Sequence, residues 1–210
     1  MKKSEKNKLR DPELTELRPY ASEDNKGRLE GVLVQGKTLS VSRGEWIVNT
    51  CRFEDCTFTG RFSPSDIMDA EFDRCDFSNA DFSGSSFIRV KFSHCRLVGS
   101  DFSGGTFRDV QICDSAGLLA NWNACSHNRV KFSHSILKEA SFNDSRTQHL
   151  EFCGCDLTGA ELFHISLNGV DLSDSVIDGV ISDPESLKGC EISFDQAASL
   201  IRLFGLKVKA

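Results

Sequence analysis

A large apolar residue returns at every fifth position from Ile67 to Ile192. Four positions in this series break the rule: Gly117, His127, Thr147 and Ser182. Two residues before each apolar centre stands a small residue, Ala, Ser, Gly, Cys or Val, except at Leu150, Ile165 and Glu185. A period of five suits neither an α-helix nor a β-strand, whose faces repeat at about 3.6 and 2 residues. The pattern therefore predicts a solenoid, in which each unit buries its apolar side chain only by stacking on its neighbours.

Two inward positions in every five, one large and one small, indicate a chain that turns after each unit. A few units then complete one coil, and successive coils stack as parallel strands. Units such as Ala80-Asp81-Phe82-Ser83-Gly84 and Ala160-Glu161-Leu162-Phe163-His164 resemble the A(D/N)LXX unit of pentapeptide repeat proteins. The resemblance implies an all-β solenoid, a right-handed quadrilateral β-helix with four units per coil. Centres twenty residues apart would then stack at roughly 4.8 Å, the spacing between strands.

The period divides the chain into three parts. Residues 1–30 are rich in charge and have little periodicity, so we expect a flexible, loosely attached segment. Residues 31–192 form the expected β-helix, with a phase shift near 59–66 because Phe58 and Ile67 are nine residues apart instead of ten. We place the missing residue around Phe62-Ser63-Pro64-Ser65, since Pro64 cannot donate a ladder hydrogen bond. Residues 193–210 are expected to form a helix and a short strand.

The sequence predicts a cytoplasmic protein without a membrane association. No stretch approaches the roughly 18 consecutive apolar residues of a membrane span. Met1-Lys2-Lys3-Ser4-Glu5-Lys6 leads into further charged residues instead of the apolar region of a signal peptide.

The nine cysteines suggest a metal site at first, above all Cys153 and Cys155 beside His149 and His164. The repeat phase argues against it. Cys153 and Cys155 are expected on opposite sides of the wall, where they could not share a tetrahedral Zn²⁺. Of the cysteines, only Cys113 and Cys153 fall at outward positions, and the inward ones serve as compact apolar side chains: Cys51, Cys56, Cys75, Cys95, Cys125, Cys155 and Cys190.

The sequence does not favour an enzyme, and it predicts no cofactor and no metal. It contains no nucleophile elbow, P-loop or glycine-rich dinucleotide fingerprint. Ser, His and Asp are abundant because the outward positions of each unit favour small polar residues. A core filled with Phe and Leu also leaves no internal pocket for a small ligand.

The repeat region is acidic. Residues 67–192 contain 19 Asp and Glu against 10 Lys and Arg. If coils are twenty residues long, the position before the centre brings Asp81, Asp101 and Glu161 onto one wall. One interpretation is solubility, which benefits from net charge. The other is that an acidic rod as wide as a nucleic-acid duplex enters a groove built for DNA. Direct binding of nucleic acid is disfavoured, because phosphates require a basic surface.

An internal duplication interrupts the acidic surface. The segment Arg-Val-Lys-Phe-Ser-His occurs at 89–94 and again at 129–134. Two coils apart, Arg89, Lys91, Arg129 and Lys131 are expected to form a basic cluster about 10 Å long, a possible secondary contact. Ordinary repeat duplication explains the identity equally well.

The weakest repeat lies between the two copies. Gly117 cannot fill its core position, whereas Leu118 and Leu119 occupy nominally outward positions. Either a bulge tucks one leucine inside, or the leucines form an exposed apolar contact. We favour the bulge.

The C-terminal part has helical spacing. Ser193 followed by Gln196 is a capping-box pattern, and Gly205 is expected to end the helix. We predict a helix that closes the solenoid and joins two copies as a homodimer, because the exposed strand edges of an open solenoid end would otherwise invite association. Its interface residues would be Phe194, Ala197, Leu200, Ile201, Phe204, Leu206 and Val208.

This layout resembles the Qnr-type pentapeptide repeat proteins, most closely their Gram-positive members. The resemblance is carried by Asp156-Leu157-Thr158-Gly159-Ala160 and by Asp195-Gln196-Ala197-Ala198-Ser199-Leu200. It implies a homodimer that mimics DNA, binds the type II topoisomerases DNA gyrase and topoisomerase IV, and protects them from fluoroquinolones. The register from Ile67 onward leaves no room for the long loops of Gram-negative members. The alternative is a scaffold that binds an unrelated cytoplasmic protein.

Overall fold

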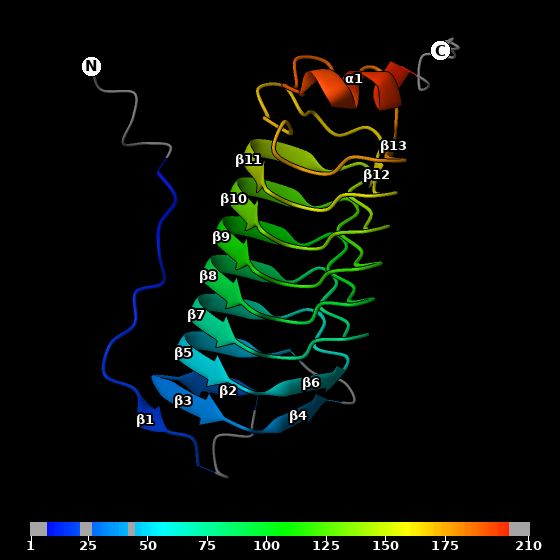
Figure 1. Ribbon diagram of the computed structural model, residues 1–210. Helices are drawn as coiled ribbons and strands as arrows, with labels where there is room; N and C mark the ends of the chain where they lie inside the picture. Colours follow the sequence, from blue (N-terminus) through cyan, green and yellow to red (C-terminus); the bar gives the residue numbers. More distant parts are fainter. Residues whose placement is uncertain (1–7, 22–26, 42–44, 202–210) are drawn as a thin grey trace, which may run out of the picture.

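The computed structural model describes residues 8–21, 27–41 and 45–201. They form a β-solenoid whose coils stack from β1 and β3 at one end to α1 at the other (Figure 1). The coil strands are β2 (Arg28–Glu30), β3 (Val32–Gln35), β4 (Thr38–Val41), β5 (Ile47–Glu54), β6 (Thr57–Gly60), β7 (Asp66–Asp73), β8 (Ser86–Ser93), β9 (Thr106–Cys113), β10 (Ser126–Ser133), β11 (Arg146–Cys153), β12 (Glu161–Leu162) and β13 (Ile181–Ser182). β1 (Arg18–Pro19) precedes them, and α1 (Phe194–Leu200) follows.

All neighbouring strands are parallel, as the period of five predicts. In the largest sheet the order is β1-β3-β5-β7-β8-β9-β10-β11. From β7 to β11 each residue pairs with the one twenty positions ahead, as Phe72 does with Phe92. The spacing stays constant to β11, so no loop is inserted between these strands.

The first coils are one residue shorter. Thr57 bridges Asp76, nineteen positions ahead, whereas Arg61 bridges Asp81, twenty ahead. The missing residue therefore lies between Thr57 and Arg61. This is several residues before Pro64, where the sequence analysis placed it, because β6 runs straight through the position at which later coils turn.

The chain turns after every unit through residues in the left-handed backbone region. Along β8 and the following coil these are Arg89, His94, Gly99 and Gly104, with φ between 52° and 68°. Four such corners per coil give the solenoid four walls, and one apolar centre per wall points inward.

The inward side chains form four columns that run the length of the rod. Phe72 stacks on Phe53 at 4.8 Å between ring centroids and on Phe92 at 5.0 Å. Trp122 continues another column, 4.4 Å from Phe102. Stacking of aromatic rings at this spacing adds to the stability gained from burial, so the columns hold each coil on the next.

The cysteines follow the predicted inward and outward phases with one exception, Cys190, which was predicted to point inward but is half-buried. Cys51, Cys56, Cys75, Cys95, Cys125 and Cys155 are buried, and Cys113, Cys153 and Cys190 are half-buried. Burial raises the pKa of the Cys155 thiol to about 11, so this side chain is a neutral apolar filler.

The expected bulge at the weakest repeat is wrong. Leu97 N donates to Ala116 O at 2.6 Å and Gly117 N to Ile136 O at 2.7 Å, so the ladder continues unbroken. A Cβ on Gly117 would lie 3.1 Å from Leu137 Cδ2, which shows that the next coil already occupies the space. Leu119 is 54% exposed.

The C-terminal helix covers the last coil. The predicted capping box is present: Ser193 N donates to Gln196 Oε1 at 2.7 Å, and Gln196 N donates to Ser193 Oγ. Gln196 Nε2 also donates to the carbonyl oxygens of Leu172 at 2.8 Å and Ser175 at 2.6 Å, which ties α1 to the solenoid. The predicted short strand at 206–208 lies outside the described residues.

The N-terminal part differs from the expected loose segment. β1 pairs with β3, and β2 pairs with β5, so the sheet begins before residue 31. Residues 8–21, here called the N-terminal strap, run along one side of the solenoid toward β1 (Figure 1). The repeat pattern does not predict this strap, because its contacts join residues far apart in the chain.

Candidate interaction surfaces

The predicted acidic wall exists as a ladder. Asp81 bridges Asp101, Asp101 bridges Asn121, Asn121 bridges Ser141, and Ser141 bridges Glu161. The three predicted carboxylates therefore lie on one wall at the spacing of the coils. All three side chains are half-buried.

Asp81 is bound within its own turn. Its Oδ1 accepts hydrogen bonds from Ser83 N at 2.9 Å and from Ser83 Oγ at 2.7 Å. Arg61 Nε lies 3.2 Å from Oδ2. Such local bonds from an Asp side chain to the backbone two residues ahead stabilise turns, so this carboxylate has a structural task as well as a charge.

The other two carboxylates are bonded between coils. Asp101 Oδ1 accepts from Asn121 Nδ2 at 3.0 Å and, within its own turn, from Ser103 N at 2.9 Å. Glu161 Oε2 accepts from Asn143 Nδ2 at 2.8 Å. These bonds use Asp101 Oδ1 and Glu161 Oε2. The other oxygen of each carboxylate is left to accept from a donor on a partner.

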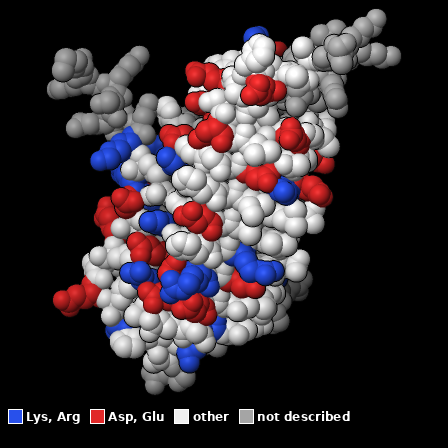
Figure 2. Space-filling view, in the orientation of Figure 1, with Lys and Arg blue, Asp and Glu red and all other residues white. Residues whose placement is uncertain are grey.

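Acidity is concentrated in the C-terminal half of the rod. Residues 135–200 contain twelve Asp and Glu but three Lys and Arg, a net charge of −9. Figure 2 shows mainly acidic side chains over the coils nearer α1, and a mixture of both signs over the lower coils. Nine of the twelve are exposed: Glu139, Asp144, Glu151, Asp171, Asp174, Asp178, Glu185, Glu191 and Asp195.

The predicted basic cluster is largely neutralised. Arg89 Nε and Nη2 donate to Asp69 Oδ1 and Oδ2, each at 2.6 Å. Lys131 Nζ lies 3.6 Å from Glu151 Oε2, and Lys91 lies on the same ladder as Lys131, two coils earlier. Arg129 pairs with Asp109 in the same way as Arg89 pairs with Asp69. The two arginines are therefore not a free basic surface.

These pairs form a corner that sequence reasoning missed. Asp69, Arg89, Asp109 and Arg129 follow one another at intervals of twenty residues, each with φ between 50° and 56°. Asp69 is 5% exposed and Asp109 2%. Burial alone would raise the pKa of Asp69, but hydrogen bonds from Arg89 and from the Glu13 backbone lower it overall. Alternation of Asp and Arg every twenty residues is the sequence signal that could have predicted these pairs.

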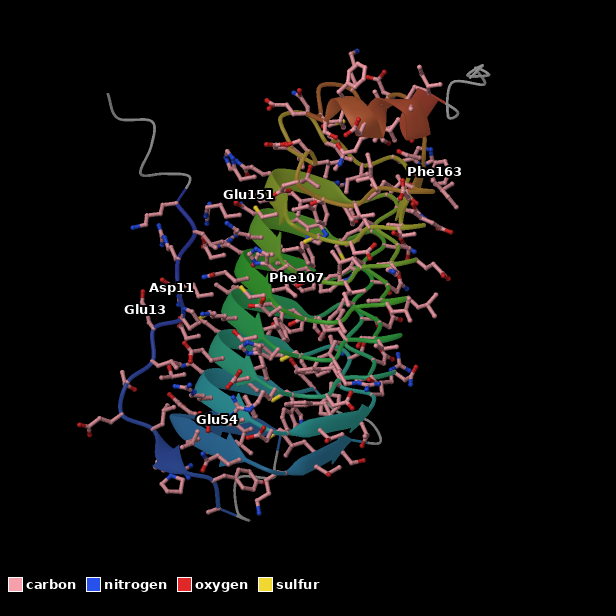
Figure 3. The ribbon with its side chains drawn as sticks, viewed as in Figure 1. Asp11, Glu13, Glu54, Phe107, Glu151 and Phe163 are labelled. Carbon is pink, nitrogen blue, oxygen red and sulfur yellow. The ribbon has the colours of Figure 1, made fainter. Side chains whose placement is uncertain are left out.

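The N-terminal strap lies against this corner. Arg10 N donates to Asp109 Oδ1 at 3.3 Å, and Glu13 N donates to Asp69 Oδ1 at 2.9 Å. Gln111 Nε2 donates to Asp11 Oδ1 at 2.7 Å. Figure 3 labels Asp11 and Glu13 on the strap, beside the wall of strands.

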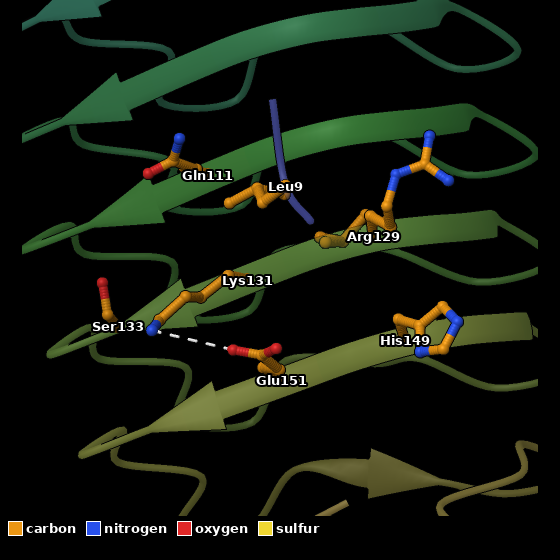
Figure 4. A pocket seen from close by; sticks show the side chains of 8 residues that line it. Leu9, Gln111, Arg129, Lys131, Ser133, His149 and Glu151 are labelled. Atoms are coloured by element: carbon orange, nitrogen blue, oxygen red, sulfur yellow. Dashed lines mark ion pairs between the residues drawn. The ribbon is translucent and has the colours of Figure 1, made fainter. Parts of the chain in front are cut away.

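A hollow of about 390 Å³ lies beyond the described end of the strap. Figure 4 shows Arg129, Lys131, Ser133, His149 and Glu151 around it, with Leu9 at its edge. Cations and hydrogen-bond donors dominate this lining, and Glu151 offsets part of the charge.

The exposed end of the rod carries part of the predicted dimer interface. Phe194 is 93% exposed, whereas Leu200 is 8% exposed and packs on its own solenoid. Ala197 and Ile201 are half-buried. Phe204, Leu206 and Val208 lie outside the described residues.

Across residues 8–21, 27–41 and 45–201, no group of three or more His, Cys, Asp and Glu side chains is placed to hold a metal ion. Over the same residues, no helix has the length and apolar character needed to cross a membrane.

The fold and its walls define a pentapeptide-type solenoid. Residues 65–152 match the pentapeptide repeat region family, and residues 135–174 match the family of pentapeptide repeats (8 copies). Together the matches span 65–174, just over half of the chain. The chain therefore belongs to the pentapeptide repeat family.

Several solved structures are similar to this chain. A trypsin-treated variant of QnrB1, a plasmid-mediated fluoroquinolone resistance protein, is 22% identical, with a TM-score of 0.45, over 87% of this chain and 100% of that one. HetL, a pentapeptide repeat protein involved in heterocyst differentiation regulation from the cyanobacterium Nostoc, is 16% identical, with a TM-score of 0.44, over 78% and 86%. No curated protein matches the sequence.

Proposed function

We propose that this chain is a non-catalytic binding protein of the type II topoisomerases DNA gyrase and topoisomerase IV, which it engages as a mimic of DNA. In this role it modulates the enzymes or protects them from fluoroquinolones. The observation that carries the proposal is the concentration of exposed carboxylates on the C-terminal coils of a straight rod. The resemblance to Qnr-type proteins in the sequence supplies the identity of the partner.

The charge distribution supports this role over mere solubility. A protein needs only a modest net charge, spread over its surface, to remain soluble. Residues 135–200 carry a net charge of −9, whereas the whole chain carries −6. The remaining residues are therefore slightly basic. A negative electrostatic potential concentrated at the C-terminal end steers the rod toward a basic groove and increases the association rate.

The proposed contact surface has two parts. The acidic wall of Asp81, Asp101 and Glu161 offers carboxylates held in place by bonds within and between coils. The coil of Asp171, Asp174 and Asp178 adds exposed groups near α1. Lys91 and Lys131 are proposed as secondary contacts, with Arg89 and Arg129 acting through the aspartates that they hold.

Supercoiling by DNA gyrase in the presence of ciprofloxacin tests this function. Purified chain at micromolar concentration should change either supercoiling itself or its inhibition by the drug. The variant Asp171→Asn, Asp174→Asn, Asp178→Asn keeps the acceptor oxygens and removes three charges, so we expect it to need at least about fivefold more protein. The control Glu45→Gln, Asp66→Asn, Asp114→Asn removes three exposed charges from the lower coils and should act like the natural chain.

A second set of variants tests the acidic wall. Asp81→Asn, Asp101→Asn and Glu161→Gln preserve hydrogen-bond acceptors at all three positions, so the solenoid should remain folded. A loss of the effect on gyrase assigns these carboxylates to partner binding. An unchanged effect assigns them to the turns alone.

The alternative function is a scaffold for an unrelated protein, and one observation favours it. The N-terminal strap shows that a wall of this solenoid holds an extended chain. If gyrase and topoisomerase IV are unaffected in every assay, the scaffold becomes the better account.

A further inference from the structure

The geometry of the strap and its corner points to a binding track for peptides, which shares with the proposed topoisomerase surface only its secondary contacts, Arg89 and Arg129. We infer that the corner of Asp69, Arg89, Asp109 and Arg129 takes an extended peptide, and that the N-terminal strap is its resident, displaceable occupant. The partner would carry a segment with an apolar residue at about every third position and acidic residues between.

The spacing of the track matches that of an extended chain. Asp69 and Asp109 are forty residues apart, which is two coils, or roughly 10 Å at the strand spacing. The strap residues that donate to them, Glu13 and Arg10, are three apart. Three extended residues also span roughly 10 Å. One aspartate on every second coil can therefore accept a hydrogen bond from every third backbone N–H of an extended peptide.

These contacts do not depend on side chains of the occupant. Both hydrogen bonds are donated by its backbone, so any extended segment other than one with proline at those positions can make them. The carboxylates are fixed for this purpose, because Arg89 and Arg129 bind both oxygens of each aspartate. An acceptor held in this way loses little conformational freedom when the peptide binds.

The pattern of apolar residues supplies the selectivity. The strap alternates between exposed residues, most of them charged, and half-buried residues. The half-buried set, which was not recognised in the sequence, is Leu9, Pro12, Leu14, Leu17 and Tyr20.

Charge favours acidic residues between the apolar ones. Hydrogen bonds to Asp69 raise the pKa of Arg89 against the effect of burial, and the nearby charge of Glu13 raises it further. Asp11 accepts from Gln111. The lysines on the same wall extend this preference toward the hollow beyond Leu9.

The strap is attached more weakly than the coils. Between residues 8 and 17 the described hydrogen bonds to the wall are those from Arg10 N, Glu13 N and Gln111 Nε2. The sheet ladder starts only at Arg18, whose N donates to Gly31 O at 2.9 Å. Few bonds and partial exposure are the marks of a segment that opens locally without unfolding of the domain.

Binding of a labelled peptide to the full chain tests the track. The probe is fluorescein-labelled peptide 8–21, and the readout is fluorescence anisotropy. In the natural chain the tethered strap competes at an effective concentration in the millimolar range. The variant Leu9→Ser, Leu14→Ser, Leu17→Ser should loosen the strap and bind the probe at least about tenfold more tightly.

A matched variant and peptide make the result specific. Lys8→Ser, Arg10→Ser, Thr15→Ser changes three exposed side chains, leaves the acidic ones in place and keeps the backbone donors, so it should bind the probe far less well than the loosened variant. Adding Asp109→Asn to the loosened variant should weaken binding again. Equal binding by all variants, or no probe bound by the loosened variant at 500 µM chain (about five hundredfold above a micromolar Kd), overturns the inference.

Hydrogen exchange gives a second test on the unmodified chain. The amides of Arg10 and Glu13 should exchange at least about a hundredfold faster than core amides such as that of Val110, because the strap opens on its own. Exchange of both groups at the same rate would show that the strap leaves only when the solenoid unfolds, and would contradict displacement by a partner.

Discussion

Arg129 and Asp109 form a two-point ion pair between neighbouring coils, with Nε–Oδ1 at 2.5 Å and Nη2–Oδ2 at 2.8 Å. Asp109 is almost completely buried, and its second described donor is Arg10 N. The same arrangement joins Arg89 to Asp69 two coils earlier. The pair therefore links the corner of the solenoid to the strap that lies on it.

The first prediction is that Arg129→Leu destabilises the chain by about 3 kcal/mol, because it leaves the buried Asp109 carboxylate without its counter-ion. Combining it with Asp109→Leu should restore much of the loss, since no unpaired charge then remains. Urea unfolding of the single and double variants measures both effects. A double variant that loses as much as the two single variants together would contradict the coupling.

The second prediction concerns acid and His127. Its side chain is 1% exposed, neither ring nitrogen has a described partner, and burial lowers its pKa from 6.5 to about 4. The unfolded chain therefore takes up a proton below pH 6.5 that the folded chain accepts only near pH 4. Stability is lost across this window as the pH falls, by roughly 3 kcal/mol in total.

His127→Phe isolates this effect from the titration of carboxylates, which both proteins share. The replacement continues the column of Phe87 and Phe107, which are stacked at 4.9 Å. The difference in free energy of unfolding between the two proteins should be constant above pH 6.5 and should widen toward pH 4. Parallel curves through this window would show that His127 does not titrate as described.

The third prediction is that Leu119→Gly stabilises the chain by roughly 0.5 kcal/mol. Leu119 has φ of 58° and is mostly exposed, and the left-handed region costs an ordinary residue more than it costs glycine. Gly99 holds the equivalent corner one coil earlier. Thermal unfolding measures the change, and Leu118→Gly, away from the left-handed corner, should instead lower the midpoint.

The regular parts of the fold could be predicted from the sequence, because they depend on residues twenty positions apart in a repeating pattern. The stacking of Phe72 on Phe92 follows from this spacing. The capping box of Ser193 and Gln196, three positions apart, follows from a local motif instead. The strap could not be predicted in this way, since Glu13 and Asp69 belong to segments without a common period.

Surface predictions were less complete for a related reason. The period placed Asp81, Asp101 and Glu161 on one wall, but it did not show that each carboxylate accepts hydrogen bonds there. It also grouped Arg89 with Arg129 as a basic cluster, although each pairs with the aspartate one coil before. Position on a wall is set by the repeat, whereas the partner of a side chain is set by the neighbouring coil.

The fourth prediction is a homodimer joined through the C-terminal end. Phe194 projects almost fully exposed from the first turn of α1, and burying it against a second copy would remove a large apolar surface from water. Phe194→Asp should convert a dimer into a monomer of 23.3 kDa in light scattering. Ala198→Asp, on an exposed position of the same helix, serves as the control for added charge.

Intact protein that is already monomeric at tens of micromolar would refute the dimer. If Phe194→Asp remains a dimer, the interface does not lie at this end of α1.

Displacement of DNA from gyrase tests the central claim most directly. Fluorescent duplex DNA is bound to purified gyrase, the chain is added, and the fraction of bound duplex is followed by anisotropy. If the acidic rod occupies the DNA groove, it should release the duplex at micromolar concentration, and Asp171→Asn, Asp174→Asn, Asp178→Asn should do so much less well. Duplex that stays fully bound at 100 µM chain, about a hundredfold above a micromolar Kd, would contradict the proposed mimicry of DNA.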